Sequence, residues 1–146
     1  MSERTKSSID IAAPPEAVLG VITDFEAYPE WTGEVKQARI DERDEAGRAT
    51  RVWFRMDAGA LRDEHTLAYE YPAEGEVRWT LVTSTMMRAL DGSYVVEPAG
   101  AGSHVTYQLA VDVKLPMVGL LKRKVEKLII DRALSGLKKR VEAIAA

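Results

Sequence analysis

Few side chains in this sequence are suited to proton transfer or metal binding. The chain of 146 residues contains two histidines, His65 and His104, and no cysteine. A metal site usually gathers several His, Cys, Asp or Glu ligands, and a thiolate nucleophile requires a cysteine. The two histidines are 39 positions apart, so we expect no histidine-based metal site and no cofactor. We assign no catalytic residue, and acid–base chemistry near neutral pH would rest on His65.

The sequence lacks the motifs of several large enzyme classes. It has no G-x-S-x-G nucleophile elbow, no P-loop and no H-E-x-x-H. The segment 100–102 begins like a dinucleotide-binding fingerprint but lacks its third glycine. Nucleic-acid binding usually combines basic and aromatic side chains on one face. The basic C-terminal segment contains no aromatic residue, so we expect no nucleic-acid partner.

Apolar and aromatic side chains recur in phase through the middle of the chain and predict an apolar pocket. In the predicted strand 62–71, His65 and Tyr69 share one face, opposite Glu64 and Glu70. A register slip of one residue would bury both glutamates, so His65 is predicted to point inward. The predicted ligand-binding residues are Trp31, Phe54, Met56, His65, Leu67, Tyr69, Trp79, Leu81, Tyr94, Tyr107, Leu109, Leu121, Val125 and Leu128.

A buried imidazole needs a hydrogen-bond partner. We expect His65 to find one in a ligand group, in Tyr69, in Tyr107 or in water. In a binding protein, replacing His65 by Gln should change affinity modestly, because Gln keeps a donor and an acceptor. In an enzyme the same replacement should remove acid–base catalysis.

The elements that would hold these residues are mostly short strands. Between residues 34 and 113 the apolar period is two, and Gly or Pro residues punctuate it. Connections this short favour antiparallel pairing, because a parallel crossover needs roughly a dozen residues or more. A helix at 16–22 and a second one soon interrupted by Pro29 precede the strands. We predict strands at 8–12, 34–41, 48–57, 62–71, 76–83, 86–97 and 103–114.

After Pro116 the period becomes helical and remains so to the end of the sequence. A helix of about 28 residues is roughly 42 Å long and must cross the whole sheet. Its apolar stripe is predicted to face the sheet and to leave a cavity between the two. The predicted stripe consists of Val118, Leu121, Val125, Leu128, Ile129, Ala133, Gly136, Leu137, Val141 and Ile144.

Composition is that of a folded domain, with 46% hydrophobic and 29% charged residues. We expect a single domain over residues 1–146, located in the cytoplasm, because no apolar run suits a membrane span or a secretory signal. Residues 114–146 carry nine basic against three acidic side chains. We interpret this excess as a solvated helix face that makes at most transient contact with an anionic membrane.

Two segments carry a family resemblance. Residues 8–18, SIDIAAPPEAV, followed by 24–31, DFEAYPEW, resemble the opening of polyketide cyclase/dehydrase-type proteins. These belong to the START-like superfamily, also called SRPBCC. Residues 90–98 and 103–107 resemble the paired last strands of that family. The resemblance implies an α+β helix-grip fold, in which a curved antiparallel sheet of about seven strands wraps around a long C-terminal helix.

The resemblance leaves several functions open, because the superfamily includes lipid carriers, coenzyme Q-binding proteins, polyketide aromatase/cyclases and plant pathogenesis-related allergens. Our main hypothesis is binding or carriage of a small hydrophobic, lipid-like or polyketide-like ligand by a monomer or weak dimer. The alternative is an aromatase/cyclase or dehydratase, although alternation points Arg55 and Arg51 outward, away from a reacting ligand. A third reading is a protein-interaction surface around Trp53.

Overall fold

A computed structural model describes residues 4–57, 62–114 and 119–145. In this part of the chain two α-helices and one 3₁₀ helix accompany seven strands. The elements are β1 (Thr5–Ile11), α1 (Pro15–Ile22), η1 (Phe25–Glu30), β2 (Val35–Arg43), β3 (Ala49–Asp57), β4 (Arg62–Glu70), β5 (Glu76–Ser84), β6 (Met87–Ala99), β7 (Gly102–Val113) and α2 (Gly119–Ala145).

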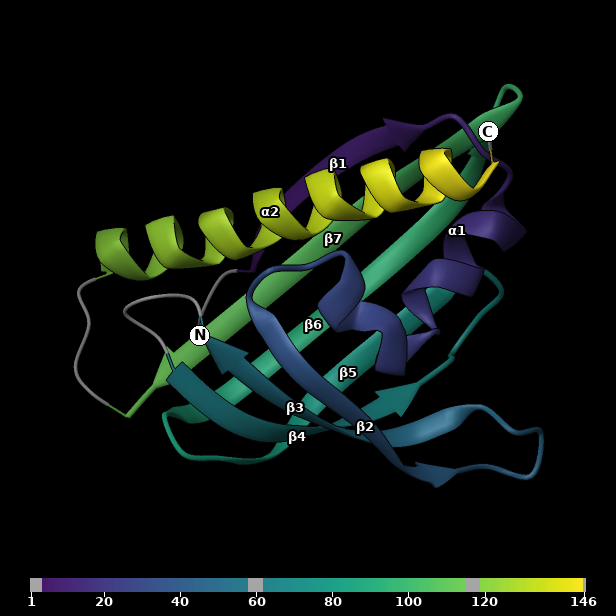
Figure 1. Cartoon of the computed structure of the whole chain (residues 1–146). Helices are drawn as coiled ribbons and strands as arrows, with labels where there is room; N and C mark the ends of the chain where they lie inside the picture. The colour runs from purple at the N-terminus through teal and green to yellow at the C-terminus, as the bar shows by residue number, and fades with distance from the viewer. Residues whose placement is uncertain (1–3, 58–61, 115–118, 146) are drawn as a thin grey trace.

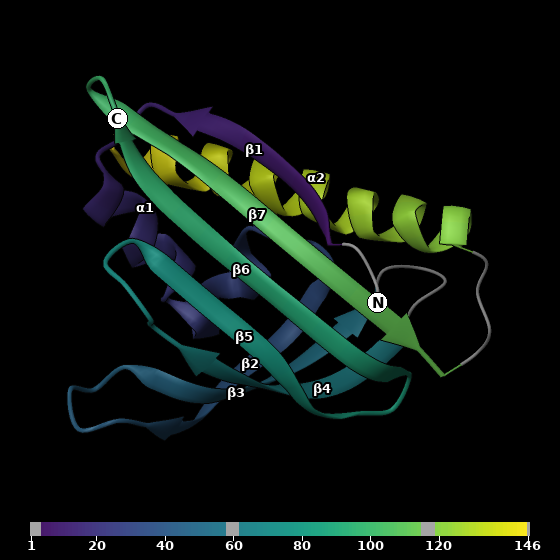
Figure 2. The ribbon, with the colours of Figure 1, turned by 180° about the vertical axis from the view of Figure 1, so that it is seen from behind.

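The described strands form one antiparallel sheet in the order β1-β7-β6-β5-β4-β3-β2. Strands β2 to β7 follow one another as a meander, and β1 pairs with β7 and forms the other edge of the sheet. Figure 1 shows α2 lying across the curved sheet, and Figure 2 shows α1 and α2 on the same side, behind the strands. The predicted helix-grip fold is confirmed.

Three of the turns between described strands contain a glycine that interrupts the alternating pattern. Gly47, Gly75 and Gly100 have φ values of 86°, 79° and 60°, a left-handed conformation that other residues rarely adopt. At Gly75 a side chain would also meet the carbonyl oxygen of Val96 at 2.5 Å. These glycines therefore permit the tight connections that make an antiparallel meander.

The two short helices form as predicted, with Pro15 in the first turn of α1 and Pro29 inside η1. The Glu26 carboxylate accepts a hydrogen bond from the backbone N–H of Ile40, at 3.1 Å. Because β2 is the last strand of the sheet, this contact satisfies a donor on its open edge and fixes η1 against it.

The buried face of α2 differs from the predicted stripe. Leu128 and Ile144 are 49% and 63% exposed, so their assignment to the core-facing stripe is wrong. The charged side chain of Glu126, by contrast, is buried. The apolar residues that α2 buries in the core are Ile130, Leu134, Leu137 and Val141.

Polar side chains of α2 complete the open edge of β1. Lys138 Nζ donates to the carbonyl oxygen of Asp10, and the Glu142 carboxylate accepts from the backbone N–H of Ala12. Lys138 and Glu142 also pair with each other at 2.7 Å. The helix therefore supplies the hydrogen bonds that a further strand would otherwise make, which protects this edge from pairing with another chain.

The described part of the chain contains no helix long and apolar enough to cross a membrane.

Candidate functional site

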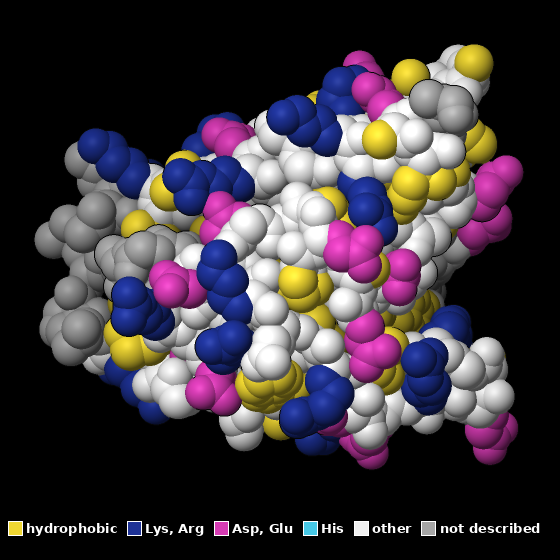
Figure 3. Space-filling model, viewed as in Figure 1, with side chains coloured by type: hydrophobic (Ala, Val, Ile, Leu, Met, Phe, Trp, Pro, Cys, Tyr) yellow, Lys and Arg dark blue, Asp and Glu magenta, His cyan; other side chains and the backbone are white. Residues whose placement is uncertain are grey.

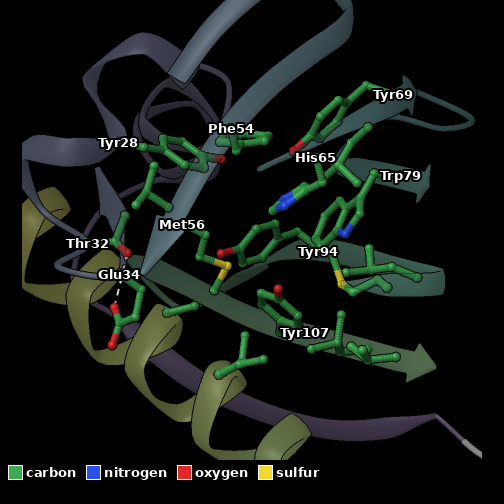
Figure 4. Close-up of a pocket in the computed structure, with 18 of the residues that line it drawn as sticks. Tyr28, Thr32, Glu34, Phe54, Met56, His65, Tyr69, Trp79, Tyr94 and Tyr107 are labelled. Atoms are coloured by element: carbon green, nitrogen blue, oxygen red, sulfur yellow. Dashed lines mark hydrogen bonds between the residues drawn. The ribbon is translucent and has the colours of Figure 1, made fainter. Parts of the chain in front are cut away.

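An apolar cavity of about 130 Å³ lies between the concave face of the sheet and α2. The inner faces of β3 to β7 form its floor, the segment from η1 to β2 forms one side, and Ile129 and Ala133 of α2 close it. Figure 4 shows the ring side chains converging on this space from different strands. The strands supply these residues at alternate positions because successive side chains point to opposite faces.

Most of the predicted ligand-binding residues line the cavity. Leu81 and Val125 are half-buried and lie away from the cavity wall, and Leu128 points to solvent. The side chain of Leu121 lies outside the described part of the structure. The predicted residues that line the cavity are Trp31, Phe54, Met56, His65, Leu67, Tyr69, Trp79, Tyr94, Tyr107 and Leu109.

Sequence reasoning missed part of the wall. Ile129 and Ala133 belong to the predicted helix stripe, but a helix pattern alone does not show which of its residues face a cavity. The residues near η1 lie outside any alternating pattern and carry no periodic signal. The missed lining residues are Tyr28, Thr32, Glu34, Val35, Met87, Leu90, Val111, Ile129 and Ala133.

A continuous set of aromatic contacts stiffens the wall. Trp79 packs against Tyr94 and Tyr107 with ring centroids 5.4 and 5.5 Å apart. The indole of Trp79 lies directly on Gly92, where a Cβ atom would approach it to 2.3 Å. Tilted and edge-on pairs of this kind add to the stabilisation from burial. Only glycine at position 92 therefore leaves room for the observed indole position.

His65 points inward, as predicted, and is 6% exposed. Its partner, however, is Asp63 and not Tyr69 or Tyr107: Nδ1 of His65 lies 3.1 Å from Oδ2 of Asp63. Asp63 shares the inward phase of β4 and is itself buried. The sequence carries a signal for this partner, because Asp63 precedes His65 by two positions and therefore lies on the same face of the strand.

Asp63 collects five hydrogen bonds. Besides His65, its carboxylate accepts from Oγ of Ser84, from the backbone N–H and Oγ1 of Thr85, and from the backbone N–H of Met86. Burial raises the pKa of Asp63, but the hydrogen bonds from His65, Thr85, Ser84 and Met86 outweigh that effect and hold the pKa well below its ordinary value. Asp63 is therefore a buried carboxylate that stays ionised.

Four tyrosines place phenol groups at the cavity wall. Burial raises the pKa values of Tyr28, Tyr69, Tyr94 and Tyr107, so all four hydroxyls stay protonated. The hydroxyl of Tyr28 donates to the carbonyl oxygen of Ile22. Within the described residues the other three hydroxyls have no protein hydrogen-bond partner, nor does the buried Nε1–H of Trp31. The hydroxyls of Tyr69, Tyr94 and Tyr107 are thus free donors in a mostly apolar wall.

The side of the cavity next to α2 is polar. Glu34 pairs with Arg132 of α2 at 2.8 Å, and the hydroxyl of Thr32 donates to its second carboxylate oxygen at 3.3 Å. Figure 4 shows Thr32 and Glu34 beside the helix. Arg140 pairs in the same way with Glu30, at 3.0 Å. Two ion pairs therefore connect the segment around η1 to α2, and the one made by Glu34 lies at the cavity wall.

The outer surface carries Arg51 and Arg55, as the alternation predicts, and the basic side chains of α2. Arg51 and Arg55 are exposed on the convex face. Trp53 lies between them, and Cζ of Arg39 is 4.7 Å from the centroid of the Trp53 ring. The basic side chains of α2 are not only solvated, as predicted. Arg132, Arg140 and Lys138 form the ion pairs and the edge contact described above. Figure 3 shows basic and acidic side chains interspersed over α2, without a large patch of one sign.

Comparison with known proteins supports the family resemblance. Residues 2–142 match the family described as "Polyketide cyclase / dehydrase and lipid transport". The chain belongs to this family. Uncharacterized proteins of Mycobacterium bovis and Mycobacterium tuberculosis are 22% identical to it over 105 residues. That match covers 72% of this chain but 63% of those proteins.

Solved structures share the fold of this family member. A START superfamily protein from Mycobacterium smegmatis is 25% identical, with a TM-score of 0.93 over 98% of this chain and 99% of its own. A Thermus thermophilus protein is 26% identical, with a TM-score of 0.82 over 99% and 100% of the two chains. The Zhui aromatase/cyclase from Streptomyces has a TM-score of 0.76 over 99% and 96%; at 12% identity it shows a common fold alone.

Proposed function

We propose that the protein reversibly binds a small, mostly apolar ligand in the cavity between sheet and helix. The observation that carries this proposal is the set of free donors in the mostly apolar wall, the hydroxyls of Tyr69, Tyr94 and Tyr107. Buried polar groups are normally hydrogen-bonded. A ligand with acceptor oxygens would satisfy these groups while its carbon skeleton fills the apolar space.

The cavity volume limits the size of that ligand. Apolar cavities of about 150 Å³ hold one benzene molecule. The volume here is about 130 Å³, so the cavity suits one substituted ring better than a long acyl chain. The proposed contacts are the predicted residues that line the cavity, together with the missed residues named above.

Native mass spectrometry of freshly purified protein and a titration with acetophenone, a single-ring ketone, test this proposal. Because Trp31 and Trp79 line the cavity, binding should change the tryptophan fluorescence, and this change should reach a plateau as the acetophenone concentration rises. The variant Ala133→Leu should fill the cavity and weaken binding at least tenfold. Ala143→Leu, at an exposed position of the same helix, is the matched control. Equal affinities for the two variants would contradict binding in this cavity.

A second candidate is a polyketide aromatase/cyclase or dehydratase that acts in the same cavity. The observation that favours it is His65, an ionisable side chain that reaches the cavity in a chain of this family. Turnover of a poly-β-ketone mimic would support this candidate. Saturable binding without turnover would support the binding protein. The outward direction of Arg51 and Arg55 removes two guanidinium groups from any such reaction.

A further inference from the structure

Asp63 and His65 form a fixed pair whose free end faces the cavity. The Asp63 carboxylate accepts four hydrogen bonds from Ser84, Thr85 and Met86, two of them from backbone N–H groups, and it is ionised, so it can only accept. Nδ1 of His65 must therefore carry the proton in its hydrogen bond with Asp63. In the neutral ring this places the lone pair on Nε2, the nitrogen that has no hydrogen bond to the described residues.

The hydroxyl groups that share the cavity with Nε2 differ from it in chemical character. The hydroxyls of Tyr69, Tyr94 and Tyr107 stay protonated and unpartnered, so they are donors, whereas neutral Nε2 is an acceptor. Figure 4 shows His65 and these tyrosines directed into one space. A fixed base and phenol donors in one cavity, from which a ligand displaces most of the water, are suited to proton abstraction next to a carbonyl group.

We propose that the protein catalyses proton transfer at the carbon adjacent to the carbonyl group of a small aryl ketone. His65 is the catalytic base, and Asp63 is a positioning residue that fixes its tautomer. This activity rests on the proposed ligand binding in the same cavity. It needs one bound ketone, and it requires neither ring closure nor a second reacting carbon.

The step balances without a further reactant. The α-carbon loses a proton to Nε2, the C–H electron pair forms the carbon–carbon double bond, and the carbonyl π pair moves to oxygen. A phenol hydroxyl donates a hydrogen bond to the resulting enolate oxygen. The imidazolium then returns a proton to the α-carbon, or to another position of the conjugated system, which gives exchange or isomerisation.

Among the described residues that line the cavity, Glu34 is the one carboxylate, and it is the competing base. One of its oxygens is paired with Arg132 and the other accepts from Thr32, so both are engaged. Nε2 of His65 makes no hydrogen bond to another residue in the described part of the chain, so its lone pair is available. The geometry therefore favours His65.

The test is hydrogen–deuterium exchange of the methyl protons of acetophenone in D₂O, followed by ¹H NMR, beside its binding by tryptophan fluorescence. His65→Gln should bind acetophenone within about threefold of the unsubstituted protein and lose at least about a hundredfold in exchange rate. His104→Gln is the matched control. His104 has a similar contact, 2.8 Å from Asp10, but lies on the outer surface away from the cavity, so its exchange rate should be unchanged.

Asp63→Asn should shift the pH profile of exchange, which a purely structural role would not do. Because this variant can fail to fold, ¹⁵N NMR of His65 in the unsubstituted protein is a second measurement, and it should show the proton on Nδ1. Binding without exchange would refute the activity and leave the proposed binding intact. The assignment of His65 would be overturned if Glu34→Gln lost exchange while His65→Gln retained it. It would also be overturned if NMR showed the neutral His65 ring protonated on Nε2. Absence of binding would refute both proposals.

Discussion

Glu126 of α2 offers a direct test of how the helix is fixed to the sheet. Its side chain is 1% exposed, and its two carboxylate oxygens accept from the hydroxyl of Thr5, at 2.6 Å, and from the backbone N–H of Val111, at 2.7 Å. The described pairing of β1 with β7 ends where Thr5 lies opposite Leu109. Val111 lies two residues further along β7, so β1 offers no described partner for the Val111 N–H. Glu126 therefore supplies the acceptor that the neighbouring strand does not.

Glu126→Ala should destabilise the protein by about 2–4 kcal/mol. Leaving the buried N–H of Val111 unsatisfied costs about 1–3 kcal/mol, and losing the hydrogen bond from Thr5 costs about 1 kcal/mol. Glu126→Gln should cost less than about 1 kcal/mol, because its amide oxygen still accepts from Val111 and its amino group can donate to the Thr5 oxygen.

Urea unfolding, monitored by circular dichroism, measures these differences. With a denaturant slope of about 2 kcal/mol/M, the Glu126→Ala midpoint should fall by roughly 1–2 M. Asp131→Ala is the control on the same helix. It breaks an exposed ion pair with Lys127, a type of contact worth about 0–1 kcal/mol. The reasoning would be refuted if Glu126→Gln were as destabilising as Glu126→Ala, or if Glu126→Ala behaved like the control.

Three further predictions follow from the burial pattern and the hydrogen bonds. Ionised Asp63 has a depressed pKa, so it contributes stability that is complete above the ordinary aspartate pKa of about 3.9 and is lost as pH falls below it. The difference in unfolding free energy between the unsubstituted protein and Asp63→Asn should therefore narrow between pH 6 and pH 3 in urea titrations; a constant difference would contradict this. Gly92→Ala should displace the indole of Trp79, lower stability by about 1–3 kcal/mol and alter the near-ultraviolet dichroism, whereas an unchanged spectrum would argue against the close contact. Ile130→Ala should cost about 2–5 kcal/mol and Leu128→Ala less than about 0.5 kcal/mol, and thermal unfolding that ranks them in the opposite order would contradict the orientation of α2.

Local pattern was sufficient to predict the strands and one wall of the cavity. Side chains alternate strictly along a strand, so the phase that contains Leu67 and Tyr69 also turns His65 inward, and no distant contact is needed to decide it. Left-handed glycines mark three of the turns for an equally local reason. With these turns so short, the antiparallel order of β2 to β7 followed from the sequence.

The orientation of α2 and the partner of His65 depended on tertiary structure. A helix surface offers several stripes three and four residues apart, and packing on the sheet selected the one with Ile130 and not Leu128. Glu126 is buried because a backbone donor of β7, 15 residues earlier in the chain, required an acceptor. Asp63 can stay ionised inside the protein because the β5–β6 turn, more than 20 residues later, brings donors to it. Hydrogen bonds between segments so distant in sequence satisfy buried charges that local patterning would place in solvent.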